Sequence, residues 1–300
     1  MRGFEDICCM TQQEVKQYMQ DYLTSKQYDV KSEEGFLYAK GDIPVLLVAH
    51  MDTVHTTQCT LTSRVDGKIS SPQGIGGDDR CGIFIIANIV KDLHCSVLLC
   101  EDEEKGGIGA NKFVKSEYLK SLDVNYMIEF DRMGSDDAVF YHCDNRDFID
   151  YVTDFTGYKE TTGTFSDISI LAPASKICGV NLSSGYYKPH TTDEYVIYDE
   201  MMDTIGVAKA LINAECDGPF EYKAKVYSSA YPTTTSRLYQ SVAQSAIKDL
   251  TLELEVIIID ANGREQVYYG SGNTKAECWF DFFANHPYVC FNQVIDYVFM

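Results

Sequence analysis

The chain has 300 residues, 45% of them hydrophobic, which is enough to bury a full core and to form one large domain plus a smaller one. Its 45 acidic residues outnumber its 25 basic residues, and the net charge of −20 argues against electrostatic binding to nucleic acid or to an anionic membrane surface. The N-terminus carries no long apolar segment and no stretch approaches a membrane span, so we expect a soluble cytoplasmic protein.

The positions of the cysteines agree with the expected cytoplasmic location. Many of the 11 cysteines lie inside apolar runs, away from the loop spacings of a disulfide framework. Examples are Cys81, Cys95, Cys100, Cys178 and Cys290. We therefore expect buried thiols in a reducing compartment.

The chain predicts an alternation of helices and buried strands. Residues 11–25 favour a helix capped by Thr11, with Glu14 three residues later. After two short strand candidates, residues 44–49 form an apolar run without alternation, which is typical of a strand covered on both faces. Further along, the pattern predicts a hairpin over 60–70 turning at Asp66-Gly67, a helix over 80–91, a strand over 96–100, a helix over 107–117, strands over 124–130 and 176–182, and a helix over 197–214.

This rhythm predicts an α/β fold: a mixed, mostly parallel sheet sandwiched by helices, forming a large domain over residues 1–217. The pattern of predicted elements changes from residue 218 onward, which indicates a small α+β domain of unknown role over 218–300. Its predicted elements are strands over 252–260 and 266–269, a helix over 274–284 and a last strand over 288–299.

Five metal-capable side chains lie where apolar runs meet polar loops. They are His50, Asp78, Glu104, Asp131 and His190. Parallel strands present binding residues at their carboxyl ends, so separate strand ends can converge on one crevice. Zinc accepts imidazole nitrogen and carboxylate oxygen, and we therefore expect a pair of zinc-like divalent ions, with cobalt or manganese as alternatives.

Three residues fit distinct roles in such a centre. Asp78 is the best bridging candidate, because the glycines before it allow the backbone to fold tightly around the ions. Glu103 fits a general base that accepts a proton from water and delivers it to the departing amine. Asp52, two residues after His50, lies on the same strand face and is placed to accept the second imidazole N–H.

Each piece alone has a simpler interpretation. A lone His-x-Asp is usually a solvated pair, and the acidic run from Glu101 to Glu104 has the composition of a charged loop. The carboxylates of Asp78 and Asp79 suit a helix start without any metal, and His190 suits an exposed loop. The order and context of the whole set favour the metal interpretation.

Five segments, in this order, resemble the exopeptidases with co-catalytic zinc, the superfamily of peptidase T, carboxypeptidase G and the bacterial leucyl aminopeptidases. The His-x-Asp-Thr-Val motif of these enzymes resembles His50-Met51-Asp52-Thr53-Val54, and their Gly-x-Asp-Asp-Lys/Arg-x-Gly motif resembles Gly76-Gly77-Asp78-Asp79-Arg80-Cys81-Gly82. Their Glu-Glu-x-Gly motif resembles Glu103-Glu104-Lys105-Gly106. The ending of peptidase T resembles Gly163-Thr164-Phe165-Ser166-Asp167 together with Gly185-Tyr186-Tyr187-Lys188-Pro189-His190. The match covers residues 35–215.

The resemblance implies a two-metal centre bridged by Asp78, with Glu103 as general base and acid and Asp52 orienting its neighbouring imidazole. The remaining ligands would form two pairs: Glu104 with His190, and His50 with Asp131. In place of Asp131, Glu129 and Asp136 are the nearby alternatives. The resemblance also implies a cis peptide bond between Asp78 and Asp79.

One departure from these relatives concerns the lid. They insert a lid or dimerisation domain between the fourth and fifth ligands or between the first and second, whereas here 59 positions (190 − 131) and 28 positions (78 − 50) separate them. Neither gap holds a domain. Substrate groups must then be recognised by other parts, such as the loop 183–187 or the C-terminal domain, and aminopeptidase activity is favoured over carboxypeptidase activity.

Three further residues are candidates for substrate binding. Tyr186 and Tyr187 are placed to donate to a developing oxyanion, although a tyrosine beside a glycine turn is more often packed. Arg80 is suited to a substrate carboxylate, but pairing with a local acid at the helix start is the simpler account.

The sequence thus predicts a two-metal aminopeptidase that cleaves a short peptide through a metal-bridging hydroxide, with homo-oligomerisation left open. The second hypothesis is an amidohydrolase or deacylase acting on N-acyl amino acids or small amides. The third is a non-catalytic relative that keeps the fold for binding, which the presence of Glu103 and a full ligand set argues against.

Overall fold

A computed structural model of the chain describes residues 1–216, 218–225, 252–259, 265–272 and 294–299. The chain divides into two compact units, one of residues 1–103 and 107–225, the other of residues 104–106 and 226–300. Across the described ranges, no helix combines the length and the apolarity needed to cross a bilayer.

The first unit is built on an eight-stranded sheet in the order β1-β2-β6-β3-β7-β10-β8-β9. The strands are β1 (Val30–Glu33), β2 (Phe36–Ala39), β3 (Ile43–His50), β6 (Cys95–Cys100), β7 (Tyr126–Arg132), β8 (Asp137–Val139), β9 (Lys159–Thr161) and β10 (Gly179–Ser183). The central run β6-β3-β7-β10 is parallel throughout, while β1, β2 and β8 pair antiparallel with their inner neighbours. The predicted mixed, mostly parallel sheet is confirmed.

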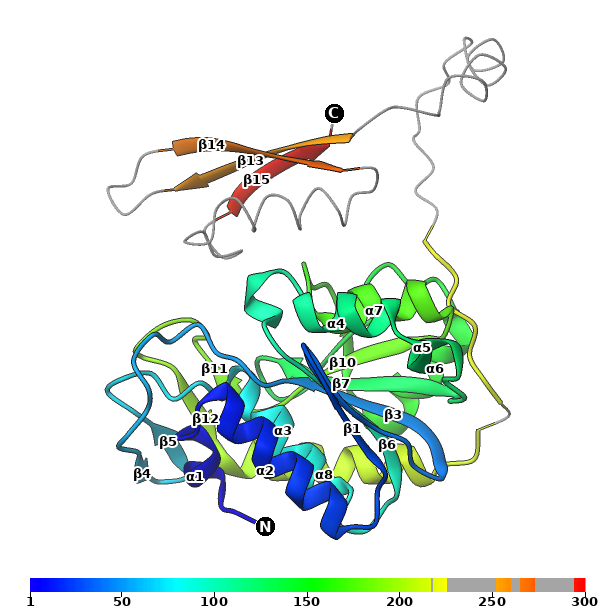
Figure 1. Cartoon of the computed structure of the whole chain (residues 1–300), viewed down its shortest axis with the longest axis horizontal. Helices are drawn as coiled ribbons and strands as arrows, with labels where there is room; N and C mark the ends of the chain where they lie inside the picture. Colours follow the sequence, from blue (N-terminus) through cyan, green and yellow to red (C-terminus); the bar gives the residue numbers. More distant parts are fainter. Residues whose placement is uncertain (217, 226–251, 260–264, 273–293, 300) are drawn as a thin grey trace. The chain divides into compact units, whose positions relative to one another are not determined.

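Helices cover both faces of this sheet (Figure 1). One face carries α1 (Phe4–Cys8), α2 (Gln12–Ser25), α3 (Gly77–Ile89), α6 (Arg146–Thr156) and α8 (Tyr198–Asn213), and the other carries α4 (Ile108–Lys115), α5 (Glu117–Lys120) and α7 (Asp167–Ser175). In β3, Leu47 and Ala49 pack toward the first group of helices, and Leu46 and Val48 toward the second. Alternate residues of one strand thus enter two cores, which explains why the run is apolar without alternation.

A smaller sheet, in the order β11-β12-β5-β4, completes the unit. It contains β4 (Ser63–Val65), β5 (Lys68–Ser70), β11 (Tyr186–Tyr187) and β12 (Tyr195–Ile197). The predicted hairpin turns at Asp66-Gly67, where both residues have positive φ. Because β5 pairs with β12, this sheet joins the chain that follows β3 to the chain near residue 190.

The segment between Asp131 and His190 was predicted only in part. It forms β8, α6, β9, α7, β10 and β11. Of its strands, β8, β9 and β10 belong to the main sheet and β11 belongs to the smaller sheet. The three-residue strands β8 and β9 are too short to show a hydrophobic period, so the sequence pattern does not reveal them. The predicted helix over 107–117 is also two helices, because Ser116 is extended and caps a new turn.

In the second unit, the described strands are β13 (Leu252–Ile259), β14 (Glu265–Gly272) and β15 (Val294–Phe299). They form an antiparallel sheet in the order β14-β13-β15. The first two coincide with strands predicted from the sequence. The helix predicted over 274–284, and the first part of the last predicted strand, lie outside the described residues.

The Asn145 side chain links helix α6 to a distant segment. Its Oδ1 accepts from the Phe148 N–H at 3.3 Å, and its Nδ2 donates to the Glu221 carbonyl at 2.8 Å. We expect Asn145→Ala to lower the free energy of unfolding by about 1–2 kcal/mol, because the helix cap and a buried hydrogen bond are both lost. Urea unfolding followed by circular dichroism measures this. The control Asn213→Ala, at an exposed position of α8, should change it by less than ~0.5 kcal/mol.

Candidate metal centre

The structure brings the five predicted ligands together from five segments of the chain. His50 ends β3 and Asp131 lies near the end of β7, two neighbouring parallel strands. Asp78 lies at the start of α3, and Glu104 lies in the 3-10 helix η1 (Glu103–Lys105) that follows β6. His190 follows β11 in a loop, with its backbone at φ 63°.

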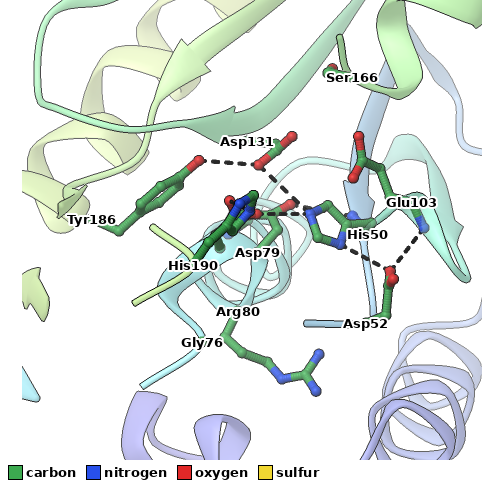
Figure 2. Close-up of polar contacts among 12 residues, drawn as sticks. His50, Asp52, Gly76, Asp79, Arg80, Glu103, Asp131, Ser166, Tyr186 and His190 are labelled. Atoms are coloured by element: carbon green, nitrogen blue, oxygen red, sulfur yellow. Dashed lines mark hydrogen bonds and ion pairs between the residues drawn. The ribbon is translucent and has the colours of Figure 1, made fainter. Parts of the chain in front are cut away.

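Asp78 lies between the two histidines. Its Oδ1 is 2.9 Å from His50 Nε2, and its Oδ2 is 3.1 Å from His190 Nε2. Figure 2 shows the side chains of both histidines, His50 and His190, at this site. Each oxygen of one carboxylate therefore faces a different imidazole, an arrangement that is compatible with a carboxylate shared by two cations.

Asp131 approaches the same imidazole from the neighbouring strand. Its Oδ1 lies 3.7 Å from His50 Nε2 and accepts a hydrogen bond of 3.2 Å from the Tyr186 hydroxyl. The Asn181 side chain fixes its backbone, accepting from Asp131 N–H at 2.9 Å and donating to its carbonyl at 2.8 Å. The carboxylate is thus held from both sides.

Asp52 connects a predicted ligand to the predicted general base. Its Oδ1 lies 3.1 Å from His50 Nδ1 and accepts a hydrogen bond of 3.0 Å from the Glu103 N–H. With Asp52 at Nδ1, the Nε2 atom of His50 is the nitrogen directed at Asp78 and Asp131. Asp52 therefore fixes the tautomer of the His50 imidazole and holds the first residue of η1 by a hydrogen bond.

Three overlapping groups offer ligand atoms that lie within 4.8 Å of one another. The groups are His50 with Asp79 and Asp131, His50 with Glu103 and Glu104, and Asp78 with Glu104 and His190. In Asp79, one oxygen accepts from the His50 N–H and the other from the Gly82 N–H, so backbone contacts occupy this carboxylate. We therefore assign Asp79 a supporting role.

The loop before Asp78 depends on glycine. Gly76 has φ +63°, and a Cβ there would lie 2.8 Å from Thr53 Cγ2, so a larger residue would push the loop away from the His50 segment. The Asp78–Asp79 peptide bond is cis, as the resemblance implied. The backbone angles of Asp78 and Asp79 are not helical, and the regular part of α3 begins after them.

The electrostatics of the site favour cations. Burial and the nearby Asp78 raise the pKa of Asp131 to about 8. For His50, burial lowers the pKa, but hydrogen bonds with Asp131, Asp52 and Asp78 together raise it well above its ordinary value. Several acids thus share a buried space with only two imidazoles, and a bound divalent cation would offset the repulsion among them.

The donor set fits zinc-like ions. Two donors of one tetrahedral zinc, each bonded at about 2.0–2.1 Å, lie roughly 3.3 Å apart. The imidazole–carboxylate separations of 2.9, 3.1 and 3.7 Å bracket this value. Imidazole nitrogen and carboxylate oxygen are also the ligand types that catalytic zinc uses, so the residues present suit such an ion.

The three predicted substrate-binding residues lie in different surroundings. Tyr186 is buried and directed at Asp131. The Tyr187 hydroxyl donates to Glu200 at 2.6 Å and its ring stacks on Tyr195, and neither partner is a predicted ligand. Figure 2 shows the Arg80 side chain extending away from the ligand cluster.

Arg80 does not fit the predicted substrate role. Its guanidinium is buried and donates to the backbone carbonyls of Met51 and Met10. The side chain is 3% exposed, so a substrate carboxylate cannot reach it in this structure. The side chain instead ties α3 to the N-terminal segment, a role that the residue type alone does not reveal.

Sequence analysis missed the supporting residues Asn181 and Glu194. Asn181 lies inside an apolar strand, and its polarity there was a signal that it has a buried partner. Glu194 is 1% exposed and accepts from the Asp78 N–H, although its sequence neighbours Thr191 to Asp193 resemble an ordinary polar loop.

Comparison with protein-family models finds no match, and neither does comparison with curated protein sequences. Solved structures do match. Aminopeptidase PepT from Bacillus cereus matches over 70% of this chain and 96% of its own, with 14% identity and a TM-score of 0.57. A tripeptidase from Staphylococcus aureus matches over 70% and 97%, with 15% identity and a TM-score of 0.55. Aminopeptidase APDkam598 from Desulfurococcus kamchatkensis matches over 71% and 94%, with 14% identity and a TM-score of 0.54. The chain therefore shares the fold of these peptidases.

The central position of Asp78 gives a direct test of metal binding. We expect the protein to bind divalent cations and Asp78→Asn to weaken that binding by at least ~100-fold, because an amide offers one neutral oxygen in place of two charged ones. Titration with Zn²⁺ against a chromophoric chelator measures the affinity. Asp193→Asn, at an exposed carboxylate near His190, is the control and should bind like the wild type. Equal affinity in the two variants would contradict the assignment.

Proposed function

We propose that the protein is a two-metal exopeptidase, and specifically an aminopeptidase that removes the terminal residue from a short peptide. The observation that carries the proposal is the Asp78 carboxylate, whose two oxygens face two different imidazoles at 2.9 and 3.1 Å. A fold shared with structures described as aminopeptidases and a tripeptidase supports the same conclusion.

In this proposal two divalent ions, with zinc as the expected metal, would share Asp78 as a ligand. His50 and Asp131 would hold one ion, and Glu104 and His190 would hold the other. The overlapping donor groups support this division, because one contains the first pair and another contains the second pair with Asp78. When bound, the ions acidify the attacking water and polarise the scissile carbonyl.

The chain's own residues supply proton transfer and orientation. Glu103 is buried and has a carboxylate oxygen within 4.8 Å of donor atoms of His50 and Glu104, so it accepts a proton from water and returns it to the leaving amine. Asp52 holds the Glu103 backbone and the His50 ring at once. Burial raises the pKa of Tyr186 well above its ordinary value, so its hydroxyl stays protonated and donates to Asp131.

The domain arrangement of the proposal keeps residues 1–217 as the catalytic part. The segments between the first and second and between the fourth and fifth proposed ligands contribute strands to the two sheets of the first unit. We infer that no lid within these segments clamps the substrate. Two other possibilities raised by the sequence stay predictions: a role of residues 218–300 in substrate recognition, and self-association of the chain.

Replacing the proposed general base separates chemistry from metal binding. We expect Glu103→Gln to lower kcat by about 10²–10⁴-fold and to leave metal content unchanged, because the amide cannot accept the proton. Assays with an unblocked tripeptide and elemental analysis measure the two quantities. Glu101→Gln is the matched control: Glu101 is equally buried, but its oxygens bind Gly35 and Gln13. Similar losses in both variants would argue against a catalytic role for Glu103.

A substrate panel separates aminopeptidase from deacylase activity. We expect peptides with a free amino terminus to be hydrolysed at least ~100-fold faster than their N-acetylated forms, because a site that binds the ammonium group rejects a neutral amide. Preferential hydrolysis of N-acyl amino acids would instead support the amidohydrolase. A metal-loaded protein inert toward both would favour a binding role.

A further inference from the structure

The Glu194 carboxylate is buried beside the proposed centre. It is 1% exposed, and its partners are three donors. Its Oε1 accepts from the Asp78 N–H at 3.0 Å, and its Oε2 accepts from the Gly76 N–H at 3.0 Å and lies 2.9 Å from His55 Nε2. A buried carboxylate is costly unless such donors satisfy it, so the group is fixed in place.

These contacts join two segments that carry proposed ligands. The Asp78 N–H belongs to the residue whose carboxylate faces both imidazoles, and Glu194 follows His190 by four positions. One side chain therefore sets the backbone of Asp78 relative to the loop of His190, whose Nε2 is 3.1 Å from Asp78 Oδ2.

His55 completes the arrangement from a third segment. It follows β3, the strand that ends at His50, by five positions. The loop passes close over its ring: a Cβ at Gly74, where φ is +87°, would lie 2.2 Å from His55 Cε1. The imidazole thus packs under the loop while its Nε2 meets the carboxylate of Glu194.

We propose that Glu194 is a positioning residue that, together with His55, holds Asp78 between the imidazoles of His50 and His190. This inference rests on the proposed function, because it requires Asp78 to be a metal ligand. It adds a determinant of metal affinity that touches neither ion. Hydrogen-bonded partners of ligands commonly change metal affinity by about 10- to 100-fold when they are mutated.

The test uses Glu194→Gln in the full-length protein. The amide keeps the size of the side chain but has one acceptor oxygen, so either Gly76 or Asp78 loses its hydrogen bond. We expect affinity for Zn²⁺ and Co²⁺ to fall by about 10- to 100-fold, and the visible spectrum of the Co²⁺-loaded protein to change. The control is Asn145→Ala, which removes a buried polar contact far along the chain and should lower the melting temperature but leave affinity and spectrum unchanged.

The outcomes distinguish this inference from the proposed function. A wild-type protein that binds neither metal overturns both. If the wild type binds them and Glu194→Gln keeps the same affinity and spectrum, the positioning role is wrong and the proposed function stands. If Glu194→Gln does not fold, His55→Leu decides, because it leaves both backbone contacts of Glu194 and removes only the imidazole: a severalfold weaker affinity supports the inference, and an unchanged affinity overturns it.

Discussion

The contact of one carboxylate, Asp78, with two imidazoles constrains how the elements of the first unit are arranged. His50 and His190 contact different oxygens of Asp78, at 2.9 and 3.1 Å, so the elements that carry them must be held at a defined separation. His50 is delivered by the central strand β3, which is buried on both faces. His190 comes from a loop that the smaller sheet connects to the chain after β3, through the pairing of β5 with β12. The smaller sheet therefore fixes the separation of two residues that are distant in sequence.

Backbone N–H groups donate many of the hydrogen bonds that hold the carboxylates around the proposed ligands. Asp52 accepts from Glu103 N–H, Asp79 from the N–H groups of His50 and Gly82, and Glu194 from those of Gly76 and Asp78. Each bond reaches a segment that holds a ligand or the proposed base. Amide hydrogens do not titrate, so the donors of these hydrogen bonds are the same at every pH. The same acids repel one another when they are buried together, and a bound cation would reduce that cost.

The sequence predicted the parts of the structure that depend on local pattern. The run ending at His50 is continuously apolar and the helix over 197–214 has helical spacing of its apolar residues, so both appear close to the predicted positions. The convergence of His50 and Asp131 also followed, because neighbouring parallel strands end at one edge. Roles decided by tertiary contacts did not follow. Arg80 is buried against two carbonyls, Tyr187 is held by Glu200, and Glu194 is buried within a polar run. Nothing in the residue types distinguishes these environments from exposed ones.

The order of the ligand segments along the chain has a consequence for biosynthesis. The proposed donors begin at His50 and end at His190, and the residue that braces them comes later still, at Glu194. During translation the first donors leave the ribosome long before the last, and contacts of such large sequence separation form late in folding. A nascent chain that ends before His190 therefore lacks one of the proposed donors, and the proposed set can be complete only after the segment containing His190 and Glu194 has been synthesised and folded.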